Sequence, residues 1–285
     1  VLVHHQKYVP ITNEGRGGSR FAAVGNTDDA NAAEIVRGME RVVVARLRDA
    51  AFFFAEDLKR PLASRRDDLA GVTFHQGLGT YKDKTERMLR VIEAMGPSLG
   101  LLTRSELEAA REAAALAKAD LTTLMVREFP ELQGTMGAIY LRAQGAPRED
   151  VIRAVQWHYH PVSVETDAPP AGRLHGGEAT VFGAVSIADK LDTLAGYFGL
   201  GLVPTGSSDP FGLRRAAQGV VRVLIDFWST ASGEARPSLR KLVAAAVAAH
   251  GVFPKRETAE VVSDLETFLL ERLRAVFVAR GAAAD

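Results

Sequence analysis

The chain has 285 residues, of which 47% are hydrophobic, enough for one large domain or two modest ones with a real core. Lys plus Arg and Asp plus Glu each number 35, so the formal net charge is zero. This balance argues against a general polyanion binder but allows a local basic patch. The absence of cysteine excludes disulfides, thiolate nucleophiles, zinc ribbons and iron–sulfur clusters. No apolar run approaches the roughly 20 residues of a membrane span and no signal peptide is visible, so we expect a soluble cytoplasmic protein with no membrane partner.

Two short strands are expected near the N-terminus, at residues 3–11 and 20–26, joined by a connection rich in turn-forming residues at 13–18. Two strands alone cannot bury a face, so they would complete a sheet whose other strands lie outside this chain. The chain starts at Val1 without Met and ends directly after a helical pattern. We therefore expect a fragment of a longer polypeptide.

From about residue 28 the pattern is helical. A first helix is expected to end at Pro61, and a second, at 83–95, to begin with a capping box of Asp83 and Glu86. Thr103 and Glu106 begin the next helix in the same way, and we expect it to continue to Pro130. Further helices are expected at 131–143, 147–159, 178–199, 210–228, 237–249 and 257–280, with a surface loop at 160–177. The predicted fold class is mainly α, with a small β element before an all-helical domain.

Three cations, Lys82, Lys84 and Arg87, lie where a glycine-containing loop at 77–79 meets the start of a helix. Backbone amides at a helix N-terminus together with these cations would suit a phosphate. On composition alone, an ordinary solvated helix start is the simpler interpretation. The loop is not a P-loop, because no Gly-Lys-Ser or Gly-Lys-Thr follows it.

A second basic helix start follows at residues 209–215. Asp209 is a candidate N-cap and Pro210 fits the first helical position, so Arg214 and Arg215 would lie within about the first turn and a half. Such a helix start would hold an anion. The alternative is that one arginine lies along apolar surface while the other is solvated.

Three acidic residues, Asp120, Asp189 and Asp192, fall inside apolar helical stretches. A buried carboxylate must be paired or bound to a metal, so these three residues are candidates for a functional role. Helical domains of the HD type hold a divalent metal with a His, a His-Asp doublet and a later Asp, and use it for phosphate-ester hydrolysis.

The segment Ala188-Asp189-Lys190 resembles the last element of that HD pattern, and Asp120 would be the Asp of the doublet. Ala119 stands where the His of the doublet should be, and His75, the candidate first ligand, lies in a loop. A site short of an imidazole binds metal weakly. The sequence thus favours an HD-like scaffold without metal chemistry. The alternative is a metal-dependent phosphohydrolase that uses His75, Asp120 and Asp189.

Several segments together resemble the beta subunit of the bacterial heterotetrameric glycyl-tRNA synthetase. No single segment is decisive, but their order and number make the resemblance specific over nearly the whole chain. The segments are 74–80 (FHQGLGT), 82–85 (KDKT), 118–121 (KADL), 131–134 (ELQG), 188–190 (ADK), 192–196 (DTLAG), 204–207 (PTGS), 209–211 (DPF) and 213–215 (LRR).

The resemblance implies a domain organisation. Residues 1–60 would be the C-terminal part of an α+β domain related to the B3/B4 region of phenylalanyl-tRNA synthetase. Residues 61–235 would be an HD-like all-helical domain, and residues 236–285 the start of the following helical body. The loop 163–177 departs from the family pattern, so we assign it no role in tRNA binding.

The resemblance also implies a division of labour between subunits. The alpha subunit activates glycine with ATP and magnesium, and the beta subunit binds glycine-specific tRNA. We therefore expect the partners to be tRNA and the alpha subunit, with no DNA, no catalytic residue and no cofactor in this chain. The missing histidine of the HD doublet agrees with the family, so we expect no metal at the degenerate HD positions His75, Asp120 and Asp189.

Taken together, the basic helix starts are predicted to contact the acceptor arm of the tRNA at phosphate and sugar, and so to position the RNA rather than read its sequence. A scaffold that only joins subunits is a third alternative, because the sequence does not show whether these cations share one face. The predicted tRNA-binding residues are Lys82, Lys84, Arg87, Arg214 and Arg215.

Overall fold

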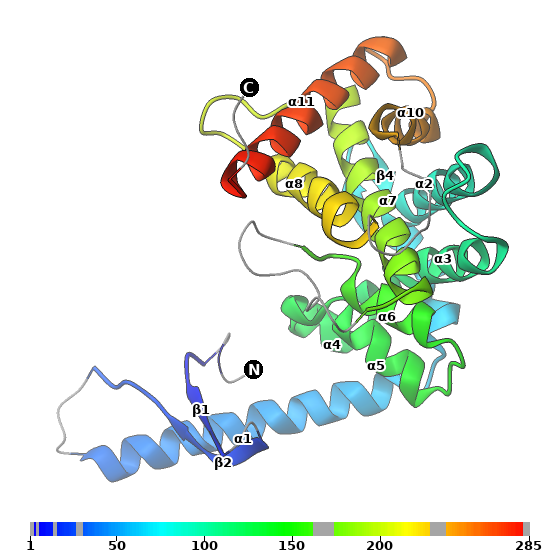
Figure 1. Cartoon of the computed structure of the whole chain (residues 1–285). Coiled ribbons are helices and arrows are strands. Elements are labelled where there is room, and N and C mark those ends of the chain that lie inside the picture. The colour runs from blue at the N-terminus through cyan, green and yellow to red at the C-terminus, as the bar shows by residue number, and fades with distance from the viewer. Residues whose placement is uncertain are drawn as a thin grey trace.

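The structure is a computed structural model that describes residue 3 and residues 6–13, 16–26, 31–161, 174–228 and 238–281. It is mainly helical, with two small two-stranded sheets, which confirms the predicted fold class. A hairpin and a long helix lie at one side of a body of packed helices (Figure 1). Within the described ranges, none of the helices combines the length and the apolar character needed to cross a membrane.

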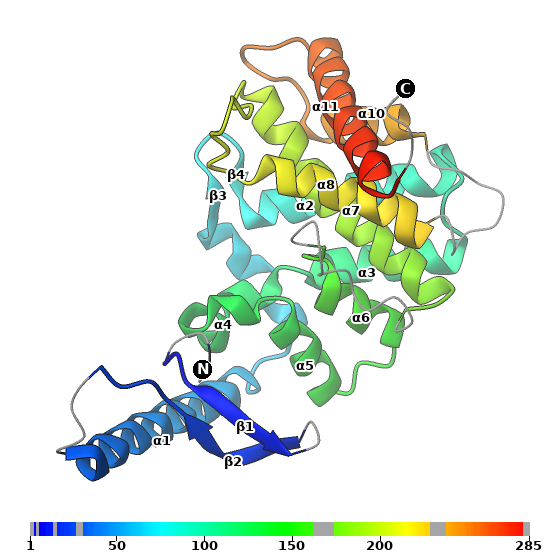
Figure 2. The ribbon, with the colours of Figure 1, turned by 60° about the vertical axis from the view of Figure 1, so that its left-hand side comes forward.

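The N-terminal hairpin is formed by β1 (Val9–Asn13) and β2 (Arg16–Ala22), which pair antiparallel. The hairpin is confirmed, although both strands lie closer to the turn than the predicted ranges 3–11 and 20–26. It lies against α1 (Ala32–Asp57), as Figures 1 and 2 both show. Helix α1 leaves apolar side chains such as Phe52 58% exposed, so this part of the chain does not enclose a core of its own.

Helix α7 (Gly177–Gly199) is the centre of the helical body and is buried along almost its whole length. Most of its buried residues are apolar, which is typical of a helix surrounded by others, but Asp189, Lys190 and Asp192 are also buried on it. The glycines Gly196 and Gly199 let its neighbours approach closely, since a Cβ at Gly199 would lie 2.0 Å from the Phe253 ring. Around α7 lie α2 (Tyr81–Glu93), α3 (Arg104–Leu116), α6 (Glu149–Trp157), α8 (Leu213–Val223), α10 (Leu239–His250) and α11 (Thr258–Ala279) (Figure 2).

The predicted start of α3 is confirmed, whereas that of α2 is displaced. Thr103 and Glu106 form the predicted capping box of α3. The box of α2 is formed by Thr80 and Asp83 rather than by Asp83 and Glu86, so this helix begins earlier than predicted. It follows a short hairpin of β3 (Thr73–His75) and β4 (Gly79–Thr80) that the sequence analysis did not predict.

The long helix predicted to continue to Pro130 is wrong. Helix α3 ends at Leu116, and a 3-10 turn at Ala119–Thr122 and the short helix α4 (Leu124–Glu128) follow. The break has a polar cause. The Thr123 hydroxyl donates to the Asp120 carbonyl at 2.6 Å and accepts from the Val126 amide, which caps α4. Helix α5 (Thr135–Ala143) then leads to α6.

Helix α8 begins at Leu213 rather than at Pro210, and Gly212 occupies its N-cap with φ +66°. Asp209 still caps the helix, because its two carboxylate oxygens accept from the Leu213 and Arg214 amides at 2.8 and 2.9 Å. The predicted loop at 160–177 lies mostly outside the described residues, as does the predicted boundary between the second and third domains.

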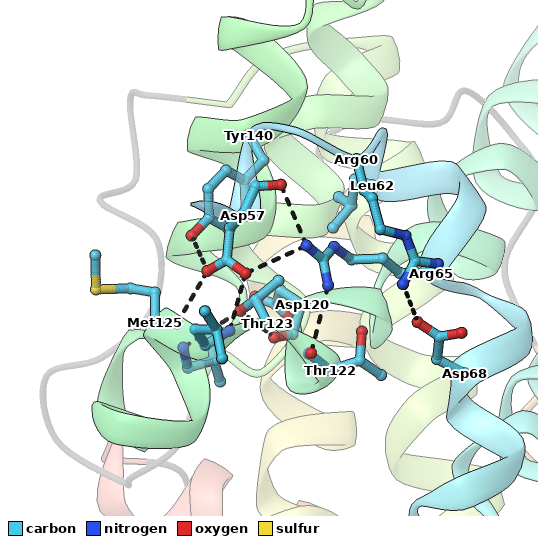
Figure 3. A network of polar contacts seen from close by, with 12 residues as sticks. Asp57, Arg60, Leu62, Arg65, Asp68, Asp120, Thr122, Thr123, Met125 and Tyr140 are labelled. Atoms are coloured by element: carbon cyan, nitrogen blue, oxygen red, sulfur yellow. Dashed lines mark hydrogen bonds and ion pairs between the residues drawn. The ribbon is translucent and has the colours of Figure 1, made fainter. Parts of the chain in front are cut away.

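The last residue of α1, Asp57, joins this helix to the helical body (Figure 3). Its buried carboxylate accepts hydrogen bonds from Arg65 at 3.2 Å and from the Tyr140 hydroxyl at 2.8 Å. It also accepts from the backbone amides of Leu124 and Met125 at 2.9 and 3.0 Å, which begin α4. One carboxylate therefore joins the end of α1 to the start of α4, to α5 and to the 3-10 turn that carries Arg65.

We predict that Asp57→Ala lowers the free energy of unfolding by about 3–5 kcal/mol, because it leaves the Arg65 guanidinium buried without a counter-charge. Tyr140→Phe removes one hydrogen bond to the same carboxylate and should cost about 1.5–3 kcal/mol. Urea unfolding followed by circular dichroism measures both. Equal stability of Asp57→Ala and the parent chain would contradict this account of the junction.

Candidate functional site

A cavity of about 420 Å³ lies where the starts of α2 and α8 meet the middle of α7. Its wall is strongly basic, with a single carboxylate, and it also carries several aromatic rings. The basic residues are Lys84, Lys118, Lys190 and Arg215, the carboxylate is Asp189, and the rings belong to Phe74, Tyr81, Tyr159 and Phe211.

Lys84 joins α2 to α7 by an ion-pair network. Its ammonium donates to the Asp189 carbonyl at 2.9 Å, to Asp192 Oδ2 at 3.0 Å and to Thr193 Oγ1 at 2.8 Å. It also lies 3.0 Å from Asp189 Oδ1. Burial opposes its charge, but the two carboxylates outweigh burial and raise the pKa of Lys84. All three of its donors are engaged inside the protein.

Asp192 is the second carboxylate of this network and has two further partners. Arg87 donates to it through Nε at 2.6 Å and through a terminal nitrogen at 3.3 Å. The His250 Nε2 lies 3.1 Å from its Oδ1. Burial acts to raise the pKa of Asp192, but Lys84, His250 and Arg87 hold it well below its ordinary value.

Lys118 lies on the other side of Asp189. Its ammonium donates to Asp189 Oδ2 at 2.8 Å and lies 3.7 Å from the centre of the Tyr159 ring, a cation–π contact. Burial lowers the pKa of Lys118 to about 8 despite the attraction of Asp189. For Asp189, burial is outweighed by Lys118 and Lys84, so its pKa falls far below the ordinary value.

Lys190 has only neutral acceptors. Its ammonium donates to the carbonyls of residues 158, 159 and 160 at 3.0, 3.2 and 3.0 Å and to Ser186 Oγ at 2.8 Å. It thereby satisfies carbonyls at the end of α6. Burial lowers its pKa to about 7. Gly219 on α8 makes room for this side chain, since a Cβ there would lie 2.5 Å from Lys190 Cε.

The structure separates the five cations that the sequence analysis selected. Lys84 and Arg87 are 2% and 7% exposed and are bound to internal partners, so the prediction that they contact RNA does not fit their burial. Lys82 is partly exposed and pairs with Asp67 at 2.8 Å. Arg214 donates to the Gly206 carbonyl at 2.7 Å. Arg215 is exposed at the cavity and has no ion pair within the described parts of the chain.

The two basic helix starts are nevertheless close together in space. Tyr81 and Lys84 on α2 line the same cavity as Arg215 on α8. The Phe211 ring, just before α8, stacks on Tyr197 of α7 at 4.3 Å and lies 6.0 Å from the His75 ring. Lys82, Arg214 and Arg215 therefore lie on segments that border one cavity.

The three degenerate HD positions are held by other interactions. His75 accepts from the Gly77 amide at 3.1 Å, and Asp120 accepts from the Gly134 and Gly137 amides at 2.6 and 3.0 Å. Burial raises the pKa of Asp120 to about 6. Asp189 is engaged by Lys118. Among the described residues, no three His, Asp or Glu side chains are grouped so that they would hold a metal ion.

Two lysines of the cavity, Lys118 and Lys190, were not selected from the sequence. Both occur in the segments that carry the family resemblance, and each lies within two residues of an aspartate in an apolar stretch. That spacing was the available signal. A lysine beside a buried carboxylate is itself a candidate for burial, because an isolated buried charge needs a partner.

The family model and the relatives that match this chain all belong to one protein family. A sequence model described as "Glycyl-tRNA synthetase beta subunit" matches residues 1–285. The chain is 41% identical to the glycine–tRNA ligase beta subunit of Chromohalobacter salexigens over 95% of this chain and 36% of that protein. It is 39% identical to the beta subunit of Desulforamulus reducens over 99% of this chain and 39% of that protein. The chain thus spans less than two fifths of the length of these relatives.

The lowered pKa values of Lys118 and Lys190 predict how stability changes with pH. Unfolded lysines stay protonated to about pH 10, whereas the folded chain releases protons from about pH 7 upward. The unfolded state then binds more protons, so the free energy of unfolding rises with pH, by about 3–4 kcal/mol between about pH 7 and 9. Urea unfolding in phosphate-free buffers measures this rise.

In the same experiment, Lys190→Met should reduce the rise in the free energy of unfolding with pH, leaving the part that comes from Lys118. Lys59→Met, at an exposed lysine, should leave the rise unchanged. A free energy of unfolding that does not rise over this pH range in the parent chain would show that the buried lysines keep ordinary pKa values.

Proposed function

The chain belongs to the glycyl-tRNA synthetase beta-subunit family, and from this premise we propose that it is a tRNA-binding, non-catalytic part of a glycine–tRNA ligase. In this proposal it supports the ATP-dependent charging of tRNA with glycine by positioning the acceptor arm. ATP and magnesium act in the alpha subunit, which is the protein partner. The domain division at residues 60 and 235 is part of the same proposal.

The observation that carries the proposal is the exposed Arg215 at the rim of a basic cavity, without an ion pair in the described part of the chain. Arg214 and Lys82 are on the two helix starts that border this cavity and are partly exposed. Such cations gain from contact with phosphates, because binding releases the counterions condensed on the nucleic acid. These three residues are the proposed RNA contacts.

Lys84 and Arg87 have a different role in this proposal. They hold α2 against α7 through Asp189 and Asp192, and so fix the position of the helix start that carries Lys82. They are positioning residues that do not touch the RNA.

The metal-dependent phosphohydrolase is not favoured by the geometry. A metal bound by Asp189 would have to displace the Lys118 ammonium, 2.8 Å from its carboxylate. Under the scaffold alternative the basic residues would lie apart in space or inside protein–protein contacts, whereas the two basic helix starts border one cavity, which supports the tRNA proposal.

We predict that the double variant Arg214→Gln/Arg215→Gln binds glycine tRNA more weakly than the parent chain. Loss of two phosphate contacts should also reduce the slope of log K against log salt by about 1.4–1.8. Fluorescence anisotropy with labelled tRNA at several salt concentrations measures both quantities.

A matched double variant, Arg104→Gln/Lys255→Gln, removes two exposed charges outside the cavity and should keep the parent slope. Identical salt slopes for the Arg214/Arg215 variant and the parent, with normal circular dichroism, would refute the assignment.

A further inference from the structure

We propose that the cavity between α2, α7 and α8 binds the phosphate group of a small phosphate monoester, and that a nucleoside monophosphate is the class of ligand that fits its aromatic wall. This proposal differs from the contact with tRNA because its ligand enters the cavity and meets Lys118 and Tyr159, which are not among the proposed RNA contacts, while Arg215 at the rim would serve both.

The first argument is a surplus of positive charge. The cavity wall contains the basic residues Lys84, Lys118, Lys190 and Arg215 against one carboxylate, Asp189. Behind the wall, Arg87 adds one cation and Asp120 and Asp192 add two carboxylates. With every lysine protonated, five cations, one of them the exposed Arg215, thus face three carboxylates, and this surplus shrinks as Lys190, whose pKa is about 7, loses its proton. Buried charges are retained when they are paired, so the surplus favours an anionic ligand.

The second argument is a set of unused donors. The Lys118 ammonium makes one hydrogen bond, to Asp189, of the three that it can donate. The Tyr159 hydroxyl is buried and has no hydrogen-bond partner within the described residues. Arg215 also lacks an ion pair there. These three residues line one cavity, and phosphate oxygens are the acceptors that such donors bind well.

The acid–base properties of the lysines agree with this geometry. Burial lowers the pKa of Lys118 to about 8 and that of Lys190 to about 7. The pKa values fall because an ammonium group away from water is destabilised when nearby carboxylates do not fully balance its charge. An anion in the cavity would remove part of that destabilisation and raise both pKa values. Ligand binding near pH 8 should therefore take up protons.

The aromatic residues point to more than a bare phosphate. The Phe74 and Tyr81 rings meet edge to face at 5.4 Å, and Phe211 is 40% exposed at the rim. An exposed aromatic ring can stack on any nucleic-acid base, because every base has a flat π-face. The volume of about 420 Å³ lies in the range of small-molecule sites.

The test is isothermal titration of the 285-residue chain in phosphate-free buffer with AMP, inorganic phosphate and adenosine. We expect AMP to bind, phosphate to bind more weakly, and adenosine not to bind at up to about 10 mM. Equal affinities for AMP and phosphate would support the phosphate site and identify free phosphate as the ligand. Equal affinities for AMP and adenosine, or no binding of either anion, would overturn the proposal.

Two variants that preserve the packing sharpen the test. Tyr159→Phe removes a single oxygen atom and should weaken AMP binding about tenfold, the value of one hydrogen bond to a charged group. Arg215→Gln, at an exposed residue, should weaken it about threefold, the value of a solvent-screened ion pair. Lys255→Gln, outside the cavity, serves as the control and should bind AMP like the parent.

Unchanged AMP affinity in both Tyr159→Phe and Arg215→Gln would place the anion elsewhere and overturn the proposal. Tyr159→Phe leaves the cations of the rim intact, so it should bind tRNA like the parent chain. The outcome of the AMP titration is thus distinguishable from that of the tRNA experiment.

Discussion

The helical body depends on two carboxylates of α7 meeting two cations of α2. Asp189 and Asp192 are three residues apart, as are Lys84 and Arg87, so each pair lies on one face of its helix. At 2.6–3.0 Å in a buried setting, these pairs leave little freedom for one helix to slide along the other. Removing one partner would leave an uncompensated charge, which costs far more than the pair contributes. The constraint fixes where the start of α2 lies, and with it one wall of the cavity.

Burial decides which cations of this chain are available to a ligand. Lys82 and Lys84 are two residues apart on the same helix start, yet the first is partly exposed and the second is fully engaged by internal acceptors. A basic cluster in a sequence therefore mixes structural cations with binding cations. Here Lys84 and Arg87 hold α2 against α7, whereas Arg215 is left exposed at the cavity.

The sequence predicted the elements whose signals are local. The mainly α fold, the N-terminal hairpin and the capping box at Thr103 followed from turn residues and side-chain caps. The sequence analysis was wrong where contacts between distant parts of the chain determine the structure. At the end of α3, Lys118 and Asp120 are buried and Thr123 caps α4, so the chain does not continue as one helix. The exposure of a lysine is also a tertiary property. Periodicity assigned Lys84 to a helix start, but only packing against α7 showed that it is buried.

If the scaffold is HD-like, the Lys118 ammonium stands beside Asp189 where a metal ion would be expected. A divalent metal beside Asp189 would lower the pKa of a bound water and supply a nucleophile. The Lys118 ammonium balances the same carboxylate at 2.8 Å and, in the proposal above, would bind phosphate oxygens without generating hydroxide. A scaffold with lysines in this position would attract phosphate groups without supplying a metal-bound nucleophile to hydrolyse them. That combination suits a surface that has to hold nucleotides or RNA without cleaving them.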